Sequence, residues 1–388
     1  MTFALSQNQN AIKYWTPIAF SRLFIYLSAN ILRTTIRKLF GRTPKGQSLH
    51  HGIMVQLLRL IMGGSVLNIA QSRSMMSFSN SVVHLKSGTF LQSSKDKWAT
   101  PVQGQGWKGF WIPFKDQVDK EQLKKDLEKK HSVNDIGSGC DIVMFAIHGG
   151  GMVMGDALLF LSSYMAWMKV LQQKHNLKIG ILSVEYSLSP EVPFPGALNE
   201  CVAAYKHLIE YQGVDPRRVI MCGDSAGANL CLTTALKIRD SYPSVGLPAA
   251  QVLFSPWVMC PKPLKTSPDD YISLTGGQLF TEAYTHNQAK IQTSPYASPI
   301  QAATLAGMPR MQIFIGGVET LRPSIERFIV KARAEGVEVE DHLKEGKSHD
   351  YALISEISGS KVVKEAHELI GKFVARVRDE YIGGVVAI

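Results

Sequence analysis

The sequence predicts an α/β fold in which helices cover both faces of a mostly parallel central sheet. From about residue 107 onward, strand-like apolar runs alternate with longer segments of helical periodicity. One of these runs, 141–147, is almost continuously apolar, as expected of a strand buried on both faces. With 388 residues and 45% hydrophobic content, the chain is large and apolar enough to bury such a sheet.

A further observation is a short motif between a predicted strand and a predicted helix. The residues Gly223, Asp224, Ser225, Ala226 and Gly227 follow an apolar run and precede a helix-like run. A strand that reverses into a helix within five residues strains the backbone at the central serine and leaves no room for side chains on its flanks. The two glycines meet this requirement. The motif therefore predicts an exposed serine hydroxyl, and its flanks disfavour a glycine turn with an incidental serine.

A glycine loop follows the apolar run 141–147 and reads His148, Gly149, Gly150, Gly151. Three glycines after a buried strand leave backbone N–H groups that a ligand can approach closely. In acyl transfer, such groups bind the oxyanion of the tetrahedral intermediate. A phosphate-binding loop would end in lysine and serine or threonine, or would have spaced glycines, and this loop has neither. Together with the serine motif, the loop predicts an oxyanion hole.

Two more motifs accompany the glycine loop and the serine turn. Tyr-Ser-Leu-Ser-Pro-Glu occupies 186–191 with Pro-Phe-Pro at 193–195, and Val-Asp-Pro-Arg-Arg-Val occupies 214–219. With these four motifs in this order, the chain resembles the hormone-sensitive-lipase branch of the α/β-hydrolases over residues 141–373. Within that branch it is most similar to the steryl-acetate and secondary-metabolite esterases that carry an extra N-terminal segment.

The resemblance implies the α/β-hydrolase fold and an acyl-enzyme formed on Ser225. It assigns the oxyanion hole to the backbone N–H groups of Gly149, Gly150, Gly151 and Ala226, chiefly those of the second and third loop glycines and of the alanine. Neither a cofactor nor a metal is expected. The sequence has no pair of helix-spaced histidines with a glutamate and no Cys-x-x-Cys pair.

A serine needs a base, and in this fold the chain order is serine, acid, histidine. Four histidines follow Ser225, namely His286, His342, His349 and His367. The resemblance favours His349, because the family has an aromatic residue two positions later and Tyr351 supplies it. His342 falls in or beside a predicted strand, His367 falls in a charged helix where we expect it to be solvated, and His286 comes too early.

The acid is expected at the end of the strand that precedes the histidine loop. By resemblance the acid is Glu319, which stands at the position of the aspartate in the Asp-x-Leu motif that relatives usually have. Glutamate is one methylene longer than aspartate, but either carboxylate can hold the imidazole in the required tautomer. The rival carboxylates are Asp341 and Asp350, expected at the surface, and Asp269 and Asp270, expected in a loop well before the last strands.

These residues predict a cofactor-free serine carboxylic-ester hydrolase with a triad of Ser225, His349 and Glu319. The expected substrate is a short-acyl ester of a hydrophobic alcohol such as a sterol or a secondary metabolite, the acyl length being implied by resemblance alone. Two alternatives stay open. An acyltransferase would use the same triad, and a ligand-binding member of the fold would have lost catalysis, which retention of the histidine and the acid disfavours.

The net charge of +10 is concentrated near the N-terminus. Residues 1–100 hold twelve Lys and Arg and one acid, a balance of +11, whereas residues 101–388 hold 30 basic and 31 acidic residues. We therefore expect an N-terminal helical segment over 1–100 and a catalytic domain over 101–388. The basic segment has no zinc or RNA-binding motif, so we expect no nucleic-acid partner.

The N-terminal segment is also mostly apolar over 14–32, its large residues from Phe20 to Phe40 recur mostly three and four apart, and a second stretch over 53–69 is similar. Three interpretations are open. The segment is a helical cap over the active-site mouth, an interfacial helix on an anionic membrane, or a membrane span, which Arg22 near its middle disfavours. Membrane-surface contact is assigned to residues 12–70.

The five cysteines predict a reducing compartment, because they are odd in number and lie mostly in apolar surroundings. The apolar N-terminal run begins late and lacks a clear small-residue cleavage site, so we expect no signal peptide. The sequence thus predicts an intracellular protein. It would be either cytoplasmic or associated with a membrane, such as that of the endoplasmic reticulum, through the N-terminal segment.

Overall fold

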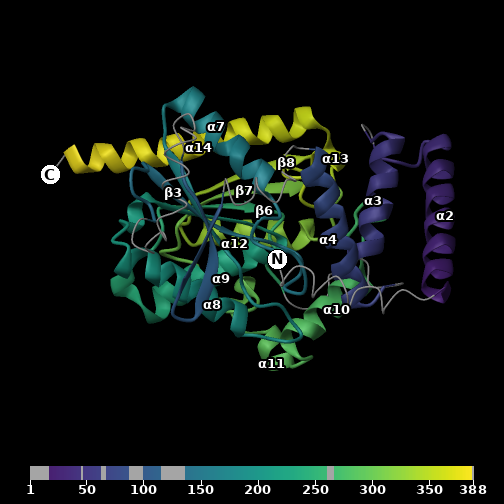
Figure 1. Cartoon of the computed structure of the whole chain (residues 1–388), viewed down its shortest axis with the longest axis horizontal. Helices are drawn as coiled ribbons and strands as arrows, with labels where there is room; N and C mark the ends of the chain where they lie inside the picture. Colours follow the sequence, from purple (N-terminus) through teal and green to yellow (C-terminus); the bar gives the residue numbers. More distant parts are fainter. Residues whose placement is uncertain are drawn as a thin grey trace.

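The computed structural model describes residues 17–44, 47–62, 67–86, 99–114, 136–259 and 266–386. An eight-stranded sheet forms its centre, with the strand order β1-β2-β4-β3-β5-β6-β7-β8 (Figure 1). β2 pairs antiparallel with β1 and β4, and all the other neighbours in the sheet are parallel. The predicted mostly parallel sheet is therefore confirmed.

The strands are β1 (Thr100–Gly104), β2 (Trp107–Ile112), β3 (Ile142–Ile147), β4 (Ile179–Val184), β5 (Val219–Asp224), β6 (Ala250–Phe254), β7 (Arg310–Gly316) and β8 (Val339–Lys344). Helices of three turns or more are α2 (Pro17–Leu39), α3 (Leu49–Met62), α4 (Ile69–Lys86), α7 (Leu161–His175), α8 (Gly196–Lys206), α9 (Ser225–Ser241), α10 (Leu274–Thr285), α12 (Arg322–Ala334) and α14 (Ser360–Val386). Shorter helical segments are η2 (His207–Tyr211), η3 (Pro216–Arg218), η4 (Pro243–Val245), α11 (Ala289–Gln292), η5 (Pro299–Gln301) and α13 (Ser355–Ser358).

Helices cover both faces of the sheet, as predicted (Figure 1). On one face, α7 and α14 bury Trp167 and Phe373 in an apolar layer. On the other face, α8, α9 and α12 bury Leu198, Leu232 and Phe328 in a second layer. The central strands β3, β4, β5 and β6 are buried along their whole length, which explains why they read as continuous apolar runs.

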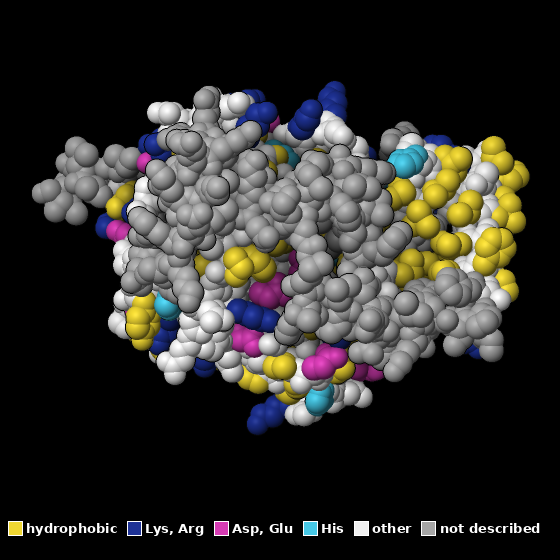
Figure 2. Space-filling model, viewed as in Figure 1, with side chains coloured by type: hydrophobic (Ala, Val, Ile, Leu, Met, Phe, Trp, Pro, Cys, Tyr) yellow, Lys and Arg dark blue, Asp and Glu magenta, His cyan; other side chains and the backbone are white. Residues whose placement is uncertain are grey.

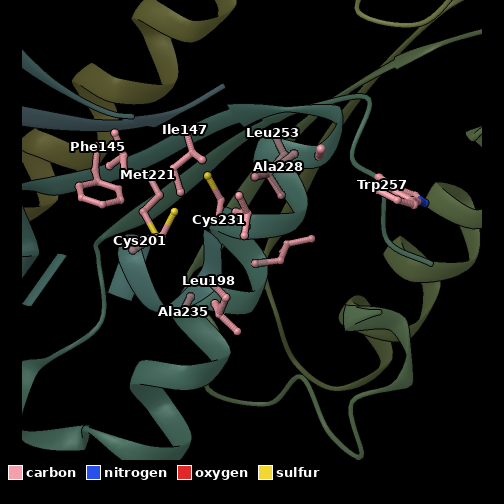
Figure 3. Packing of buried hydrophobic residues seen from close by; sticks show 14 of the residues in the cluster. Phe145, Ile147, Leu198, Cys201, Met221, Ala228, Cys231, Ala235, Leu253 and Trp257 are labelled. Carbon is pink, nitrogen blue, oxygen red and sulfur yellow. The ribbon is translucent and has the colours of Figure 1, made fainter. Parts of the chain in front are cut away.

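Four cysteines belong to these apolar layers and are buried free thiols: Cys140, Cys201, Cys222 and Cys231. Figure 3 shows Cys201 of α8 and Cys231 of α9 beside Met221 of β5. Burial raises the pKa of each thiol. The prediction of buried free thiols is confirmed for these four, and Cys260 lies outside the described residues.

The register of the parallel strands brings their carboxyl ends to one edge of the sheet. Ile147 at the end of β3 pairs with Gly223 of β5, and Phe254 at the end of β6 pairs with Phe314 of β7. The loops after β3, β5, β7 and β8 therefore meet at this edge. In open parallel sheets this edge is where ligand sites form.

Three helices, α2, α3 and α4, form an N-terminal helical layer (residues 17–86) at one end of the molecule, with α2 outermost (Figure 1). α2 packs on α3, and α3 packs on α4 and α13. Ion pairs of two arginines tie the layer to the rest of the chain, and a third arginine, Arg59, donates to the carbonyls of Ser267 and Asp270. Arg37 makes a two-pronged ion pair with Asp269 at 2.9 and 3.0 Å, and Arg73 pairs with Glu191 at 2.8 Å and donates to the carbonyl of Ser189.

The sequence indicated two apolar stretches in this region, and the structure has three helices. The second stretch, 53–69, covers most of α3 and reaches only the first residue of α4. Residues 63–66 between these helices lie outside the described chain. In the part of the chain that is described, no helix combines the length and the apolar character needed to cross a membrane.

Candidate active site

The serine motif forms the predicted strand–turn–helix. β5 ends at Asp224 and α9 begins at Ser225, whose backbone φ is +50°, a left-handed conformation that costs energy for a residue with a side chain. A Cβ added at Gly223 would lie 2.7 Å from the carbonyl oxygen of Ile147, and one at Gly227 would lie closer still to the same atom. The two glycines are therefore required by the close approach of β3 to the turn.

The glycine loop packs directly against this turn. The N–H of Gly149 donates to Oδ1 of Asp224 at 2.8 Å. The ring of His148 stacks on Tyr186 with centroids 4.2 Å apart, and the Tyr186 hydroxyl donates to the carbonyl of His148 at 2.9 Å. Asp224 and Tyr186 thus fix the loop. Because the Gly149 N–H is already donated to Asp224, it is not free to bind an oxyanion, and the predicted oxyanion-hole role of Gly149 is wrong.

The other two loop glycines have backbone conformations that favour glycine. Gly150 has a φ of +99° and Gly151 a φ of +65°. A Cβ on Gly151 would lie 2.6 Å from the ring of Phe280. The three successive glycines therefore meet two different requirements. At Gly149 a Cβ would collide with the Asp224 side chain. At Gly150 and Gly151 the backbone is in the left-handed region.

His349 lies in the loop after β8 and is buried, with only 1% of its surface exposed. Its Nδ1 lies 3.6 Å from Oε2 of Glu319, which follows β7 and is also buried. The Glu319 carboxylate accepts a hydrogen bond of 2.5 Å from the Ser255 hydroxyl. The ring of His349 meets Tyr271 edge-on, with centroids 5.4 Å apart. The structure therefore brings together the predicted base and acid.

Two carboxylates that the sequence placed elsewhere belong to this cluster. Asp350 was expected at the surface, but it is buried, and its Oδ2 lies 3.3 Å from Nε2 of His349. Asp270 lies in a loop well before the last strands, as expected, but its Oδ1 accepts the backbone N–H of His349 at 3.0 Å. The surface expectation for Asp350 is therefore wrong, and folding brings the loop of Asp270 onto the carboxyl edge of the sheet. In the sequence, the only pointer to Asp350 was its position next to His349.

The remaining candidates lie apart from the cluster. Asp341 is exposed and pairs with Arg333, as expected of a surface carboxylate. His286 is exposed at the end of α10. His342 lies on β8 and contacts Glu340 at 3.0 Å. His367 was expected to be solvated, but it is buried with its ring edge-on to Trp167, and burial lowers its pKa to about 4.

The electrostatics of the cluster favour a protonated imidazole. Burial alone would lower the pKa of His349, but the carboxylates of Asp350 and Glu319 outweigh it and raise the pKa to about 10. Burial raises the pKa of Glu319. Burial and the neighbouring Asp350 also raise the pKa of Asp224 well above its usual range. The site thus holds several acids around one base.

A narrow cavity of about 30 Å³ lies beside Ser225. It is lined mainly by apolar groups, which come from α3, α10 and the loops after β3, β6 and β7: Met62, Gly151, Trp257, Ile272, Gly277, Phe280, Thr281 and Leu321. Within the described residues, no three His, Cys, Asp or Glu side chains are grouped to hold a metal ion.

This fold and site define the class of the protein, which is an α/β-hydrolase. A family model described as "alpha/beta hydrolase fold" matches residues 144–353, more than half of the chain. The chain belongs to this family, and within it to the hormone-sensitive-lipase branch. Hormone-sensitive lipase of Mus musculus is 40% identical over 94 residues, which are 24% of this chain and 12% of that protein.

Microbial relatives align over longer stretches. The carboxylic ester hydrolase LipN of Mycobacterium tuberculosis is 26% identical over 254 residues, covering 62% of this chain and 65% of the relative. An acetyl-hydrolase of Streptomyces hygroscopicus is 35% identical over 158 residues, which cover 39% of this chain and 52% of that relative. The chain thus spans about two thirds or less of these relatives.

A solved structure of a hormone-sensitive lipase from a metagenome library shares the fold. It superposes with a TM-score of 0.64 at 22% identity and covers 87% of this chain and 99% of its own.

Proposed function

We propose that the protein is a serine carboxylic-ester hydrolase that acts through Ser225, His349 and Glu319. The observation that carries this proposal is the meeting of a strained serine turn, a glycine loop and a buried imidazole–carboxylate pair at one edge of the sheet. Each of the three parts has a role in acyl transfer, and the family membership supports the same chemistry.

In the proposed reaction, the Ser225 hydroxyl oxygen attacks the ester carbonyl carbon while His349 takes the hydroxyl proton. The N–H groups of Gly150, Gly151 and Ala226 stabilise the resulting oxyanion. His349 returns the proton to the departing alcohol, which leaves an acyl-enzyme. A water molecule, deprotonated by the same imidazole, then attacks the acyl carbon and regenerates the serine. Glu319 holds the imidazole and stabilises its charged form.

The cavity beside Ser225 supports a short acyl group. Its volume of about 30 Å³ suits an acetyl-sized group better than a long chain. Apolar side chains such as Met62, Trp257 and Phe280 line it, which suits the methyl group of an acetyl ester. The acetyl-hydrolase among the relatives supports the same acyl size. For the alcohol we propose a sterol or a secondary metabolite, because the exposed apolar side chains of the N-terminal helical layer favour a hydrophobic substrate.

Labelling with a fluorophosphonate probe tests the proposed nucleophile. We expect wild type to be labelled, and Ser225→Ala and His349→Ala to lose labelling. His286→Ala is the matched control, because this exposed histidine lies away from the site and should leave labelling unchanged. Absence of labelling in wild type would overturn the catalytic proposal and favour a ligand-binding protein. Addition of a second alcohol then separates hydrolysis from acyl transfer, since a transferase would form a new ester.

We further propose that the N-terminal helical layer contacts an anionic membrane surface. Half of the large hydrophobic side chains exposed in the described chain lie on α2 and the residue after it: Phe24, Ile25, Leu32, Ile36, Leu39 and Phe40. At about 100° per residue they fall within one arc of roughly 160°. The opposite side of α2 carries Thr34, which is buried where α2 packs on α3. Figure 2 shows hydrophobic side chains gathered at this end of the molecule.

The charge on α2 favours anionic lipid over a second copy of the chain. α2 has no acidic residue, and Arg22, Arg33 and Lys38 are exposed around the apolar arc. A second copy would bring the same positive charges together, whereas anionic headgroups attract them. α3, on which α2 packs, ends at Met62 in the cavity wall beside Ser225. A membrane-bound ester would therefore lie near the cavity.

Sedimentation with lipid vesicles tests this contact. We expect wild type to sediment with phosphatidylcholine vesicles that contain phosphatidylserine, and much less without it. Changing Phe24, Leu32, Leu39 and Phe40 to serine should abolish most of the binding, because each loses apolar area to bury in the interface. Tyr211→Ser with Val330→Ser is the matched control, since both residues are exposed elsewhere. If the fourfold serine variant sedimented with vesicles as well as wild type, membrane contact through α2 would be refuted. Self-association of wild type without vesicles would instead favour a second copy of the chain as the partner of α2.

A further inference from the structure

The imidazole of His349 lies between two carboxylates, one at each ring nitrogen. Glu319 faces Nδ1 at 3.6 Å, and Asp350 faces Nε2 at 3.3 Å. With Glu319 on Nδ1, the proposed reaction requires Nε2 to take the proton of Ser225. Neither ring nitrogen makes a hydrogen bond within the described residues, so the nitrogen that the serine needs faces Asp350 instead.

The backbone of Asp350 fixes this arrangement. Its φ is +52°, in the left-handed region that aspartate tolerates better than most residues. Its N–H donates to the Ser255 hydroxyl at 2.9 Å, and that hydroxyl donates in turn to Glu319. Its Oδ2 also accepts the Tyr271 hydroxyl at 3.1 Å. Two hydrogen bonds through Ser255 thus link the backbone of Asp350 to the Glu319 carboxylate, and a third, from Tyr271, holds the Asp350 carboxylate.

We propose that Asp350 is a positioning residue that competes with Ser225 for Nε2 of His349 and sets the pH range in which the serine is activated. This inference rests on the proposed function. Asp350 touches the imidazole and not the reacting ester, so it acts through the base. Loss of its charge should free Nε2 for the serine without removing Glu319 from Nδ1.

The groups around Asp350 come from four segments at this edge. His349 and Glu319 face it from the loops after β8 and β7, and Asp270 and Tyr271 from the loop before α10. Asp224 at the end of β5 is electrostatically coupled to it. Among these groups only His349 becomes positively charged, so each ionised acid favours the imidazolium. A raised imidazole pKa means that the neutral base forms only at higher pH, which moves the acid limb of activity to higher pH.

Two substitutions remove the charge without disturbing the backbone. Asp350→Asn keeps the shape of the side chain, and asparagine tolerates the left-handed conformation. Asp350→Gly removes the side chain, and glycine adopts a positive φ without strain. For both variants we expect the acid limb of kcat/KM to move down by about one pH unit, which gives roughly tenfold higher kcat/KM at pH 7. Tyr271→Phe leaves the Asp350 charge in place and should move the limb less.

An unchanged acid limb in both Asp350 variants would overturn the inference. A uniform loss of kcat/KM at all pH values with no movement of the limb would overturn it too, because it would show a structural role only. The limb is read from initial rates on p-nitrophenyl acetate, with correction for its spontaneous hydrolysis.

A second readout keeps this inference separate from the proposed function. NMR titration of isotopically labelled histidine gives the imidazole pKa of His349 directly, with the signal assigned through His349→Gln. We expect this pKa to fall by about one unit in Asp350→Asn. An unchanged pKa would refute the role of Asp350 even in an active enzyme, whereas a lowered pKa in a protein with no ester hydrolysis would refute only the proposed function.

Discussion

The sheet-forming part of the chain and the N-terminal helical layer use apolar residues in opposite ways. In the sheet, β3 to β6 bury every residue, and a site forms where their carboxyl ends meet. In the layer, α2 buries one side on α3 and, together with Phe40 after it, exposes six large hydrophobic side chains on the other. Charge differs in the same way, since residues 101–388 are close to neutral and residues 1–100 carry +11.

This difference teaches that the two regions are under different physical constraints. Around Ser225 the backbone itself is constrained, because Gly223 and Gly227 approach β3 too closely for any side chain. On α2 the constraint is on the surface, where exposed apolar and basic side chains need an external partner to be covered. We therefore propose that the sheet region carries the chemistry and that the layer brings the substrate to it.

Removal of the serine hydroxyl should have the largest effect. For Ser225→Ala we expect kcat on p-nitrophenyl acetate to fall by about 10⁴- to 10⁶-fold, because the acyl-enzyme cannot form. The thermal midpoint should change little, since the side chain loses one oxygen. Retention of more than a few per cent of wild-type turnover would assign the nucleophile elsewhere in the sheet region.

Substitution of a constrained glycine should affect stability. For Gly227→Ala we expect a loss of about 3 kcal/mol or more in the free energy of unfolding, because the new Cβ meets the carbonyl groups of Ile147 and His148. Gly277→Ala in α10 is the matched control, where an added Cβ meets nothing within 4 Å. It should be neutral or stabilise by up to about 1 kcal/mol. Urea unfolding measures both, and equal stability of the two variants would disprove the steric constraint.

Acid should destabilise the sheet region through His367. Its pKa lies at about 4 in the folded protein, below the unfolded value of 6.5, because burial disfavours its charged form. The unfolded state therefore binds more protons between these two values, and stability falls as pH drops from about 6.5 to 4. His367→Leu should reduce this loss by up to about 3 kcal/mol. An unchanged pH dependence of urea unfolding would show that His367 is not its source.

Loosening the layer should have the smallest effect. For Arg73→Met we expect a loss of about 1 kcal/mol, because Arg73 is partly exposed and its partner Glu191 more so. The substitution should speed proteolytic cleavage within the layer while p-nitrophenyl acetate turnover stays near wild type. Arg217→Met, which breaks an exposed ion pair away from the layer, is the control. Faster cleavage in both variants would mean that Arg73 does not tie the layer to the sheet region.

The sequence predicted those parts of the site that are local in the chain. The turn at Ser225 and the loop at Gly149 follow from steric requirements that neighbouring residues reveal. Pairing of His349 with Glu319 depended on the chain order of a known family, because their contact is made only by the register of β7 with β8. Burial of Asp350 was beyond sequence reasoning, since it depends on Ser255 and Tyr271 from distant loops.

The most direct test of this division of roles compares two substrates and two proteins. Wild type and the variant with Phe24, Leu32, Leu39 and Phe40 changed to serine are assayed on water-soluble p-nitrophenyl acetate and on a hydrophobic acetate ester held in anionic vesicles. We predict equal rates on the first substrate, and for the variant a rate lower by about tenfold or more on the second. An equal loss on both substrates, or no loss on the vesicle-held ester, would contradict the account.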